Sequence, residues 1–253
     1  MRAQLMECHS VSSNSISRKI RLRYAYVKGA DKMSSRASPA GRGRGPAGRR
    51  AVAPGGGGIT PAQRRALATI GAELSRLIRY DDESIVNDQW LRRRYDSGQF
   101  ATVGDARRAT VITAWHEAGH AVAAVTVGAR FRSASIHAGR DTEGRVHGIQ
   151  GAGDLAFVVD AAGQIAEQLR AWSLLDDDRL REWLPTWRGD GGDAKRFRAN
   201  IRPRFGTDEF AAWRHAETLL TPQRLKIRQV ARALLIHPRH LPHQAVVAVA
   251  ADA

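Results

Sequence analysis

Cysteine is nearly absent from this 253-residue chain, and lysine is scarce. Cys8 is its single cysteine, which excludes an internal disulfide framework and a metal site built from cysteines alone. Only five of the 40 basic residues are lysine, and the rest are arginine. No apolar run approaches the roughly 20 residues that a membrane-spanning helix needs. Residues 1–13 also lack the apolar core of a secretory signal. We therefore expect a cytoplasmic protein without a membrane span.

The net charge of +15 is concentrated at the beginning of the chain. Residues 1–53 hold twelve basic and two acidic residues, a net of +10, whereas residues 54–253 hold 28 basic and 23 acidic residues, a net of +5. The first 58 residues are also rich in Ser, Gly and Pro, so we predict a disordered basic tail over residues 1–58. Nucleic-acid binding is one use of such a tail. Because arginine is favoured throughout the chain, we prefer the interpretation of a solvated segment.

The rest of the chain, with its globular composition of 43% hydrophobic residues, predicts mostly helices. The spacing of apolar residues, together with Pro, Gly and capping residues, predicts helices over residues 61–79, 82–95, 106–127, 154–175, 193–200, 207–219, 222–236 and 241–251. Alternating residues predict strands over 131–138 and 145–149, joined by a turn. The fold class is therefore mainly α (α+β), with one small β-hairpin. We expect residues 59–104 to form a helical N-terminal segment or cap, and residues 105–253 to form the main domain.

The pattern His-Glu-x-x-His occurs at residues 116–120, inside one of the predicted helices. His116 and His120 would lie one turn apart on the same helix face. Two imidazoles so placed can bind one Zn²⁺ ion at about 2.0–2.1 Å. Glu117 could then accept a proton from a water that the metal activates. Gly119 costs about 1 kcal/mol in a helix relative to Ala, which indicates a close packing contact at that position.

Two histidines leave a catalytic zinc site one protein ligand short. Thr126 stands where the metzincin pattern requires a third histidine, so that class is excluded. Glu167, on a later predicted helix, is the ligand that a thermolysin-like site would use. Asp193 is the alternative, because it opens a helix after a glycine-rich loop and the helix N-terminus favours a carboxylate. The remaining histidines beyond the motif are interpreted as polar surface residues: His137, His147, His215, His237, His240 and His243.

The order of segments HEAGHA, SASIHAGRDTEGRVHG, AAGQIAEQL and GDGGDAKRF resembles the metallopeptidase domain of the FtsH-type membrane-anchored AAA proteases. The resemblance covers the C-terminal three-fifths of the chain. It implies that His116, His120 and Asp193 bind the zinc ion and that Glu117 is the catalytic glutamate. It also implies that Glu167 supports a ligand histidine and does not itself bind the metal.

The chain departs from that family in three respects. Ala162, Gln164 and Gln168 differ from the family's GGRxAEE-like run. The sequence contains no G-x-x-x-x-G-K-[ST] phosphate loop and no membrane anchor. ATP-driven unfolding is therefore not implied for this chain, and a substrate would have to be flexible, unfolded or delivered by a separate ATPase partner.

These observations predict a zinc-dependent metalloendopeptidase in residues 105–253, acting on a protein or peptide substrate. Two other functions are compatible with the sequence. One is a dedicated regulatory protease that cuts a single protein. The other is a non-catalytic module that is stabilised by metal and binds nucleic acid through the basic tail. Glu117 argues against the last of these, because a structural metal site needs no base.

Overall fold

The computed structural model describes residues 61, 65, 68–73, 80–137, 144–188 and 192–251. All of them belong to the unit that spans Gly56–Ala253. The tail predicted over residues 1–58 lies outside the described residues, as does most of the turn predicted between the two strands. Within the described ranges, no helix is both long enough and apolar enough to cross a membrane.

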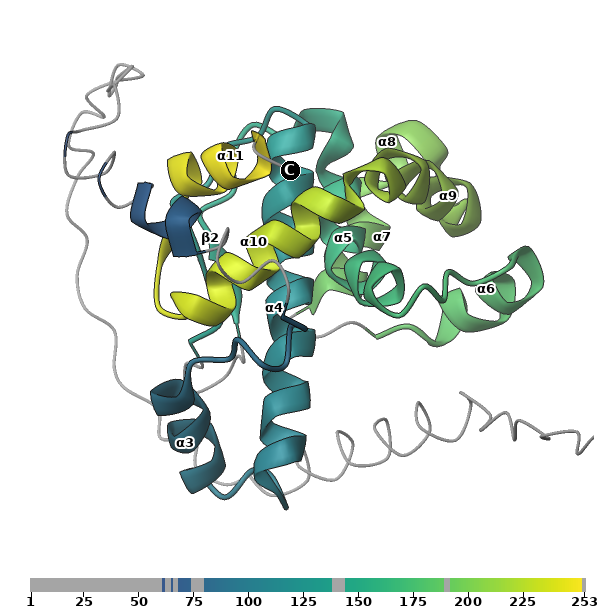
Figure 1. Ribbon diagram of the computed structural model, residues 1–253. Coiled ribbons are helices and arrows are strands. Elements are labelled where there is room, and N and C mark those ends of the chain that lie inside the picture. Colours follow the sequence, from purple (N-terminus) through teal and green to yellow (C-terminus); the bar gives the residue numbers. More distant parts are fainter. Residues whose placement is uncertain are drawn as a thin grey trace, which may run out of the picture. The chain divides into compact units, whose positions relative to one another are not determined.

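The longest described helix is α4 (Val103–Thr126), which runs between two groups of elements (Figure 1). Oγ1 of Thr102 accepts a hydrogen bond from the backbone N–H of Asp105 and caps the helix. The sequence predicted that this helix would begin at Ala106. The helix instead begins earlier, because Thr102 takes the capping position. Asp105 lies in the first turn, where its negative charge interacts favourably with the helix dipole. At the other end, Gly128, with φ +75°, follows the last turn of the helix.

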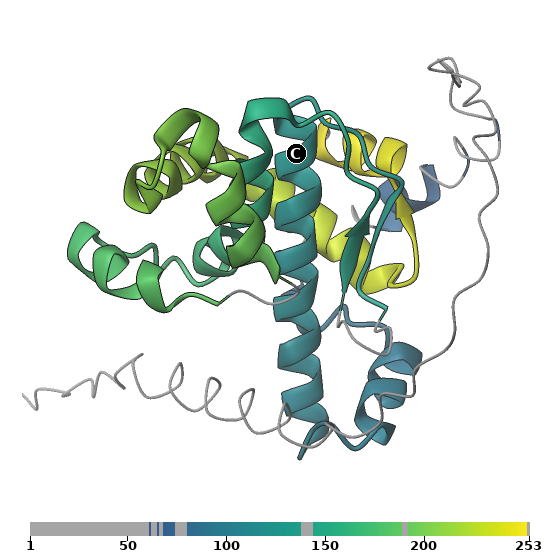
Figure 2. The ribbon, with the colours of Figure 1, turned by 180° about the vertical axis from the view of Figure 1, so that it is seen from behind.

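The other elements lie on the two sides of α4 (Figures 1 and 2). Helices α5 to α9 lie on one side, the small sheet and α11 lie on the other, and α10 crosses α4. The helices are α3 (Asp88–Asp96), α5 (Ala156–Arg170), α6 (Asp177–Trp183), α7 (Asp193–Asn200), α8 (Arg202–Phe205), α9 (Glu209–Leu220), α10 (Arg224–Ile236) and α11 (His243–Ala251). Three 3₁₀ segments accompany them: η1 (Gly153–Leu155), η2 (Leu184–Thr186) and η4 (Thr221–Gln223).

Helices α4 and α5 approach each other closely at Gly119. A Cβ atom at this position would lie 2.4 Å from the carbonyl oxygen of Ala162 and 2.6 Å from the Cβ of Ala166. No side chain fits in that space, so the glycine allows the two helices to touch. This contact is the packing reason that the sequence indicated for a glycine inside a helix.

A cluster of aromatic rings holds α7 against the rest of the domain. Phe197 of α7 is fully buried. Its ring centroid lies 5.5 Å from that of Trp187, 5.9 Å from that of Trp213 and 6.4 Å from that of Phe157, all at tilted or edge-to-face angles. Trp183 stacks on Trp187 at 5.6 Å. Helix α7 therefore begins at a fixed place beside α5.

The sheet has three short antiparallel strands in the order β2-β1-β3: β1 (Ser133–Ser135), β2 (Arg145–His147) and β3 (Leu241–Pro242). The two predicted strands do pair, with Ala134 opposite Val146, although both are shorter than predicted. The third strand was not predicted, since residues 241–242 had been assigned to a helix. Leu241 pairs with Ala134 over only two residues, which is too short to leave a periodic pattern in the sequence.

The predicted fold class is confirmed: the described chain is mainly helical, with one small antiparallel sheet. Other predicted boundaries were also wrong: the helix expected over residues 154–175 ends at Arg170. The helix expected over residues 82–95 begins only at Asp88, because Asp81 accepts hydrogen bonds from Ser84 and forms a turn first. Residues 177–183, for which no helix was predicted, form α6, which Asp176 caps.

Candidate metal centre

The candidate centre begins with two histidines of α4. His116 and His120 are one turn apart, and their Nε2 atoms lie 3.0 Å from each other. His120 is buried, and His116 is partly buried. Two nitrogen lone pairs at this separation repel unless a proton or a cation lies between them. The helix therefore presents a pair of nitrogens that attracts positive charge.

Helix α5 determines which nitrogen of each imidazole carries hydrogen. Nδ1 of His116 donates to Oε1 of Glu167 at 2.8 Å, and Nδ1 of His120 donates to the carbonyl oxygen of Val159 at 2.6 Å. A backbone carbonyl and a carboxylate can only accept, so both Nδ1 atoms carry hydrogen. In the neutral rings, the Nε2 lone pairs are then free to bind a metal, an arrangement common around metal-binding histidines.

Asp193 completes the group from the first residue of α7. Its Oδ2 atom lies 3.3 Å from Nε2 of His116 and 3.5 Å from Nε2 of His120. Gly192 precedes it with φ +91°, a left-handed conformation that glycine adopts without strain and that turns the chain into the helix. Ligand atoms of all three residues lie within 4.8 Å of one another, so the group could hold a metal ion.

The spacing of the three atoms suits a tetrahedral ion. Ligands about 2.0–2.1 Å from a zinc ion in a tetrahedral array lie about 3.3–3.4 Å from each other. The separations of 3.0, 3.3 and 3.5 Å bracket this value. Two imidazoles and a carboxylate are also a ligand set that zinc accepts.

Gly163 of α5 lies directly against both ligand nitrogens, with no side chain between. A Cβ atom there would lie 2.4 Å from Nε2 of His116 and 2.6 Å from Nε2 of His120. It would thus stand beside the same nitrogens that face Asp193. The absence of a side chain at this position is a second feature, independent of the ligands, that fits a bound ion.

Electrostatics in the group also favour a cation. Burial opposes the charged form of His116, but hydrogen bonds to Asp193 and Glu167 outweigh it and raise the pKa of His116 well above its usual value. Burial likewise opposes the charge of Asp193, yet hydrogen bonds from His116 and His120 hold the pKa of Asp193 well below its usual range. Without a metal, the group therefore favours a proton on His116 and a negative charge on Asp193.

Glu117 lies beside the histidines and is buried. Burial raises the pKa of its carboxyl, although the charges of His116 and His120 lower it in part. A Cβ atom at Gly144, just before β2, would lie 2.7 Å from Cγ of Glu117. The edge of the small sheet thus closes over this glutamate. A buried carboxylate with a raised pKa is a better proton acceptor than an exposed one.

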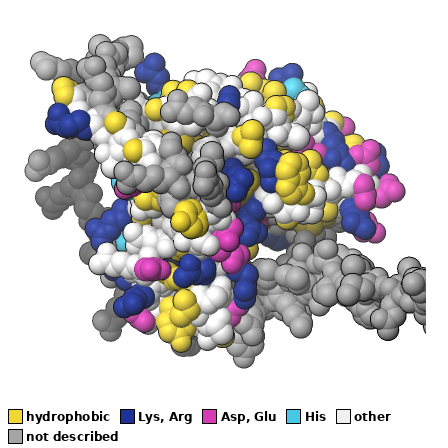
Figure 3. Space-filling view, in the orientation of Figure 1, with side chains coloured by type: hydrophobic (Ala, Val, Ile, Leu, Met, Phe, Trp, Pro, Cys, Tyr) yellow, Lys and Arg dark blue, Asp and Glu magenta, His cyan; other side chains and the backbone are white. Residues whose placement is uncertain are grey.

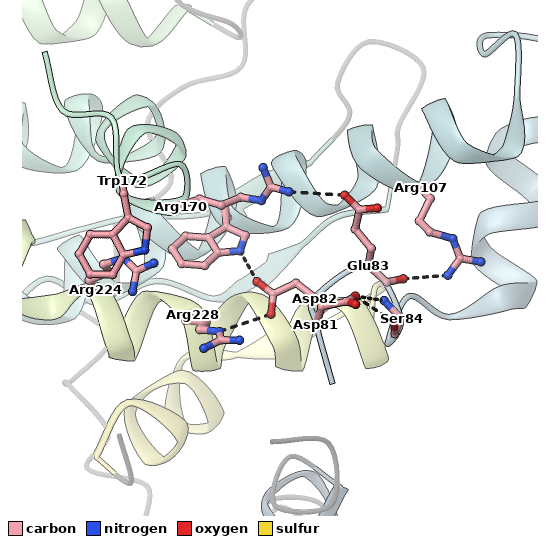
Figure 4. Close-up of a pocket in the computed structure, with 10 residues that line it drawn as sticks. Asp81, Asp82, Glu83, Ser84, Arg107, Arg170, Trp172, Arg224 and Arg228 are labelled. Carbon is pink, nitrogen blue, oxygen red and sulfur yellow. Dashed lines mark hydrogen bonds and ion pairs between the residues drawn. The ribbon is translucent and has the colours of Figure 1, made fainter. Parts of the chain in front are cut away.

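A polar anchor fixes the turn of α4 that carries the motif. Nε1 of Trp115 donates to Oδ2 of Asp82 at 2.9 Å, and Arg232 of α10 donates to the other oxygen at 2.9 Å. Arg228 lies 3.5 Å from the same carboxylate (Figure 4). Asp82 therefore ties the residue before His116 to α10, and the hollow drawn in Figure 4 lies around this anchor.

The structure brings together His116, His120 and Asp193, and it places Glu167 behind one imidazole. Most of the other histidines have neighbours elsewhere. His137 lies against Trp90, His215 against Phe157 and Phe205, His243 against Phe131, and His237 against Glu73.

Sequence reasoning did not identify the contributions of Gly163, of Val159, or of Arg196, which donates a hydrogen bond to Oδ1 of Asp193. Gly163 could have been identified, because a glycine inside a predicted helix indicates a close packing contact, as it did at Gly119. The carbonyl of Val159 leaves none, since every residue has one. Arg196 could not be distinguished from the many other arginines of the chain.

Compared with known proteins, the chain matches no family model, and neither a curated protein nor a solved structure is significantly similar to it. The geometry of this centre is therefore the main basis for assigning a function to the chain.

Proposed function

We propose that the chain is a zinc-dependent metalloendopeptidase with His116, His120 and Asp193 as zinc ligands and Glu117 as general base. One observation carries the proposal: three ligand atoms from α4 and α7 converge at separations of 3.0–3.5 Å. The buried carboxylate of Glu117 lies next to them.

A zinc ion in this place supplies two things, polarisation of a peptide carbonyl and a lower pKa for a water molecule. The chain's own residues supply the rest. Glu117 accepts a proton from the attacking water and later returns it to the leaving amine. Its raised pKa makes it a better acceptor of that proton. Glu167 and Val159 hold the imidazoles in the orientation that binding requires.

The number of ligands favours a catalytic site over a structural one. A structural zinc site has four protein ligands, whereas a catalytic site has three and leaves one position for water or substrate. Among the described residues, the group contains three ligands. The adjacent base, Glu117, has no use in a structural site.

The position of Glu167 favours an FtsH-like site over a thermolysin-like one. In the thermolysin-like alternative, Glu167 would bind the metal. Its carboxylate is instead engaged with Nδ1 of His116, while Nε2 of the same ring faces Asp193. This arrangement agrees with the ligand set that the sequence resemblance implies, with Asp193 in the third place.

The proposal is tested by peptide hydrolysis. Purified protein should cleave an unfolded substrate such as casein, and a chelator should stop the reaction until zinc is added. Glu117→Gln should keep one zinc per chain but lose activity by about 10²–10⁴-fold or more, because Gln cannot take up the proton. Glu182→Gln, an exposed change on α6, serves as the matched control. Wild-type turnover in Glu117→Gln would refute the mechanism.

A further inference from the structure

We propose that Arg196 is a positioning residue: it makes Asp193 bind the metal through one oxygen and so keeps a coordination position open for water. This inference rests on the proposed function, since it concerns the same centre. It follows from a chain of hydrogen bonds that begins at Asp193 and ends on α5.

The two oxygens of the Asp193 carboxylate have different partners. Oδ2 faces the imidazoles, 3.3 and 3.5 Å from their Nε2 atoms. Oδ1 accepts a hydrogen bond from the guanidinium of Arg196, which lies one turn later on α7. One oxygen of the carboxylate is therefore directed to the metal-binding nitrogens, and the other is engaged with Arg196.

Arg196 is itself held in place. Its Nε donates to Oδ1 of Asp160 at 3.0 Å, and Nδ2 of Asn200 donates to the other oxygen of Asp160 at 2.7 Å. Asp160 is buried on α5, one residue after the Val159 carbonyl that orients His120. One stretch of α5 thus orients a histidine ligand directly and the aspartate ligand through Arg196.

This arrangement has a consequence for the number of ligands. A carboxylate can bind a cation through one oxygen or through both. If Asp193 used both, its second oxygen would compete for the fourth position, which a hydrolytic site needs for water. Because Oδ1 already accepts a hydrogen bond from Arg196 and Oδ2 faces the imidazoles, binding through Oδ2 alone is favoured. Arg196 would thereby act on the reaction through Asp193, without touching the substrate.

The test compares Arg196→Met with Lys195→Met, a matched control. Both changes remove one positive charge from α7, but Lys195 is exposed and has no role in the proposed chain. The Arg196 side chain is 53% exposed, so its ion pairs stabilise the fold little and the variant should fold. Zinc content is measured first, and Co²⁺ is then bound in place of zinc, because its visible absorption is intense with four ligands and weak with five.

We expect Arg196→Met to retain one metal ion per chain, to show the weaker absorption of five-coordinate Co²⁺, and to lose about 10–100-fold in kcat. Lys195→Met should match the wild type in all three measurements. Asp160→Asn, which leaves Arg196 in place but weakens its anchor, should change the spectrum in the same direction and by less. This second variant decides the matter if Arg196→Met does not fold.

The failures of the two proposals are distinguishable. If the wild type binds neither zinc nor Co²⁺, the proposed function is wrong and this inference with it. If the wild type binds metal and cleaves peptide, while both variants show its unchanged Co²⁺ spectrum and kcat, the function stands and the role of Arg196 is refuted.

Discussion

Glu167 lies behind His116: its Oε1 accepts a hydrogen bond from Nδ1 at 2.8 Å, while Nε2 of the same ring faces Asp193 at 3.3 Å. The two carboxylates thus lie on opposite nitrogens of one imidazole. Only Asp193 is also near His120, at 3.5 Å from its Nε2. This relationship separates the two residues that the sequence offered as candidates for the third ligand, of which the resemblance favoured Asp193.

The first prediction concerns the ligands. His116→Ala, His120→Ala and Asp193→Ala should each abolish stoichiometric zinc binding, because two remaining ligands make a poor zinc site. Zinc per chain is measured after dialysis by atomic emission. His215→Ala, on α9, is the control and should retain one zinc. Full occupancy in the His116 and His120 variants would contradict the metal assignment.

The second prediction concerns Glu167. Glu167→Ala should keep one zinc per chain but weaken its binding by about 10–100-fold, because the orientation of His116 is then less well held. The dissociation constant is obtained by competition with a chelator. If Glu167→Ala removed the metal and Asp193→Ala kept it, the site would belong to the thermolysin-like class.

The third prediction distinguishes the roles of two glycines at the contact between α4 and α5: Gly119 on α4 and Gly163 on α5. Gly163→Ala should abolish zinc binding, because its methyl group would lie against both Nε2 atoms. Gly119→Ala should instead destabilise the domain by about 1–3 kcal/mol, because its methyl group would overlap Ala162 and Ala166. Zinc content and urea denaturation measure the two effects.

Gly71→Ala is the control for both glycines. A Cβ atom there would meet no atom within 4 Å, and alanine is favoured over glycine in a helix by about 1 kcal/mol. This variant should bind zinc and be at least as stable as the wild type. Equal zinc affinity in Gly163→Ala would show that the space beside the histidines is not needed for a metal.

The fourth prediction concerns pH. Despite burial, hydrogen bonds to Asp193 and Glu167 raise the pKa of His116 well above 6.5 in the metal-free protein. Below that raised pKa zinc must displace a proton, so its apparent affinity should increase as pH rises and level off above the pKa. Calorimetry in buffers of different ionisation enthalpy should detect proton release on zinc binding at neutral pH. No proton release there would contradict a protonated metal-free site.

The charge pattern of the surface bears on the partners of the chain. On the face shown in Figure 3, basic and acidic side chains of the described residues are interspersed with apolar ones. Much of the excess positive charge instead belongs to residues 1–53, which the structure does not describe. Nucleic-acid binding through that segment stays a prediction, and so does a separate ATPase partner.

Some features of this protein follow from the sequence alone. The spacing of His116 and His120 requires only a local helix to place both on one face, and α4 is that helix. The helical class and the pairing of two strands likewise depend on periodic patterns of near neighbours. The cost of Gly119 within a helix was enough to indicate a close packing contact there, although not that α5 is the partner.

The tertiary structure decided which carboxylate faces the metal-binding nitrogens, which the local sequence pattern could not show. Glu167 is 51 residues from His116 and Asp193 is 77 residues from it, so their distances depend on how α5 and α7 pack against α4. Gly163 and the aromatic cluster around Phe197 set that packing. Local periodicity carries no information on such long-range contacts, because they arise from the burial of side chains on several helices at once. The sequence therefore determined the histidine pair and its helix, and only the fold placed Asp193 in front of the imidazoles and Glu167 behind one of them.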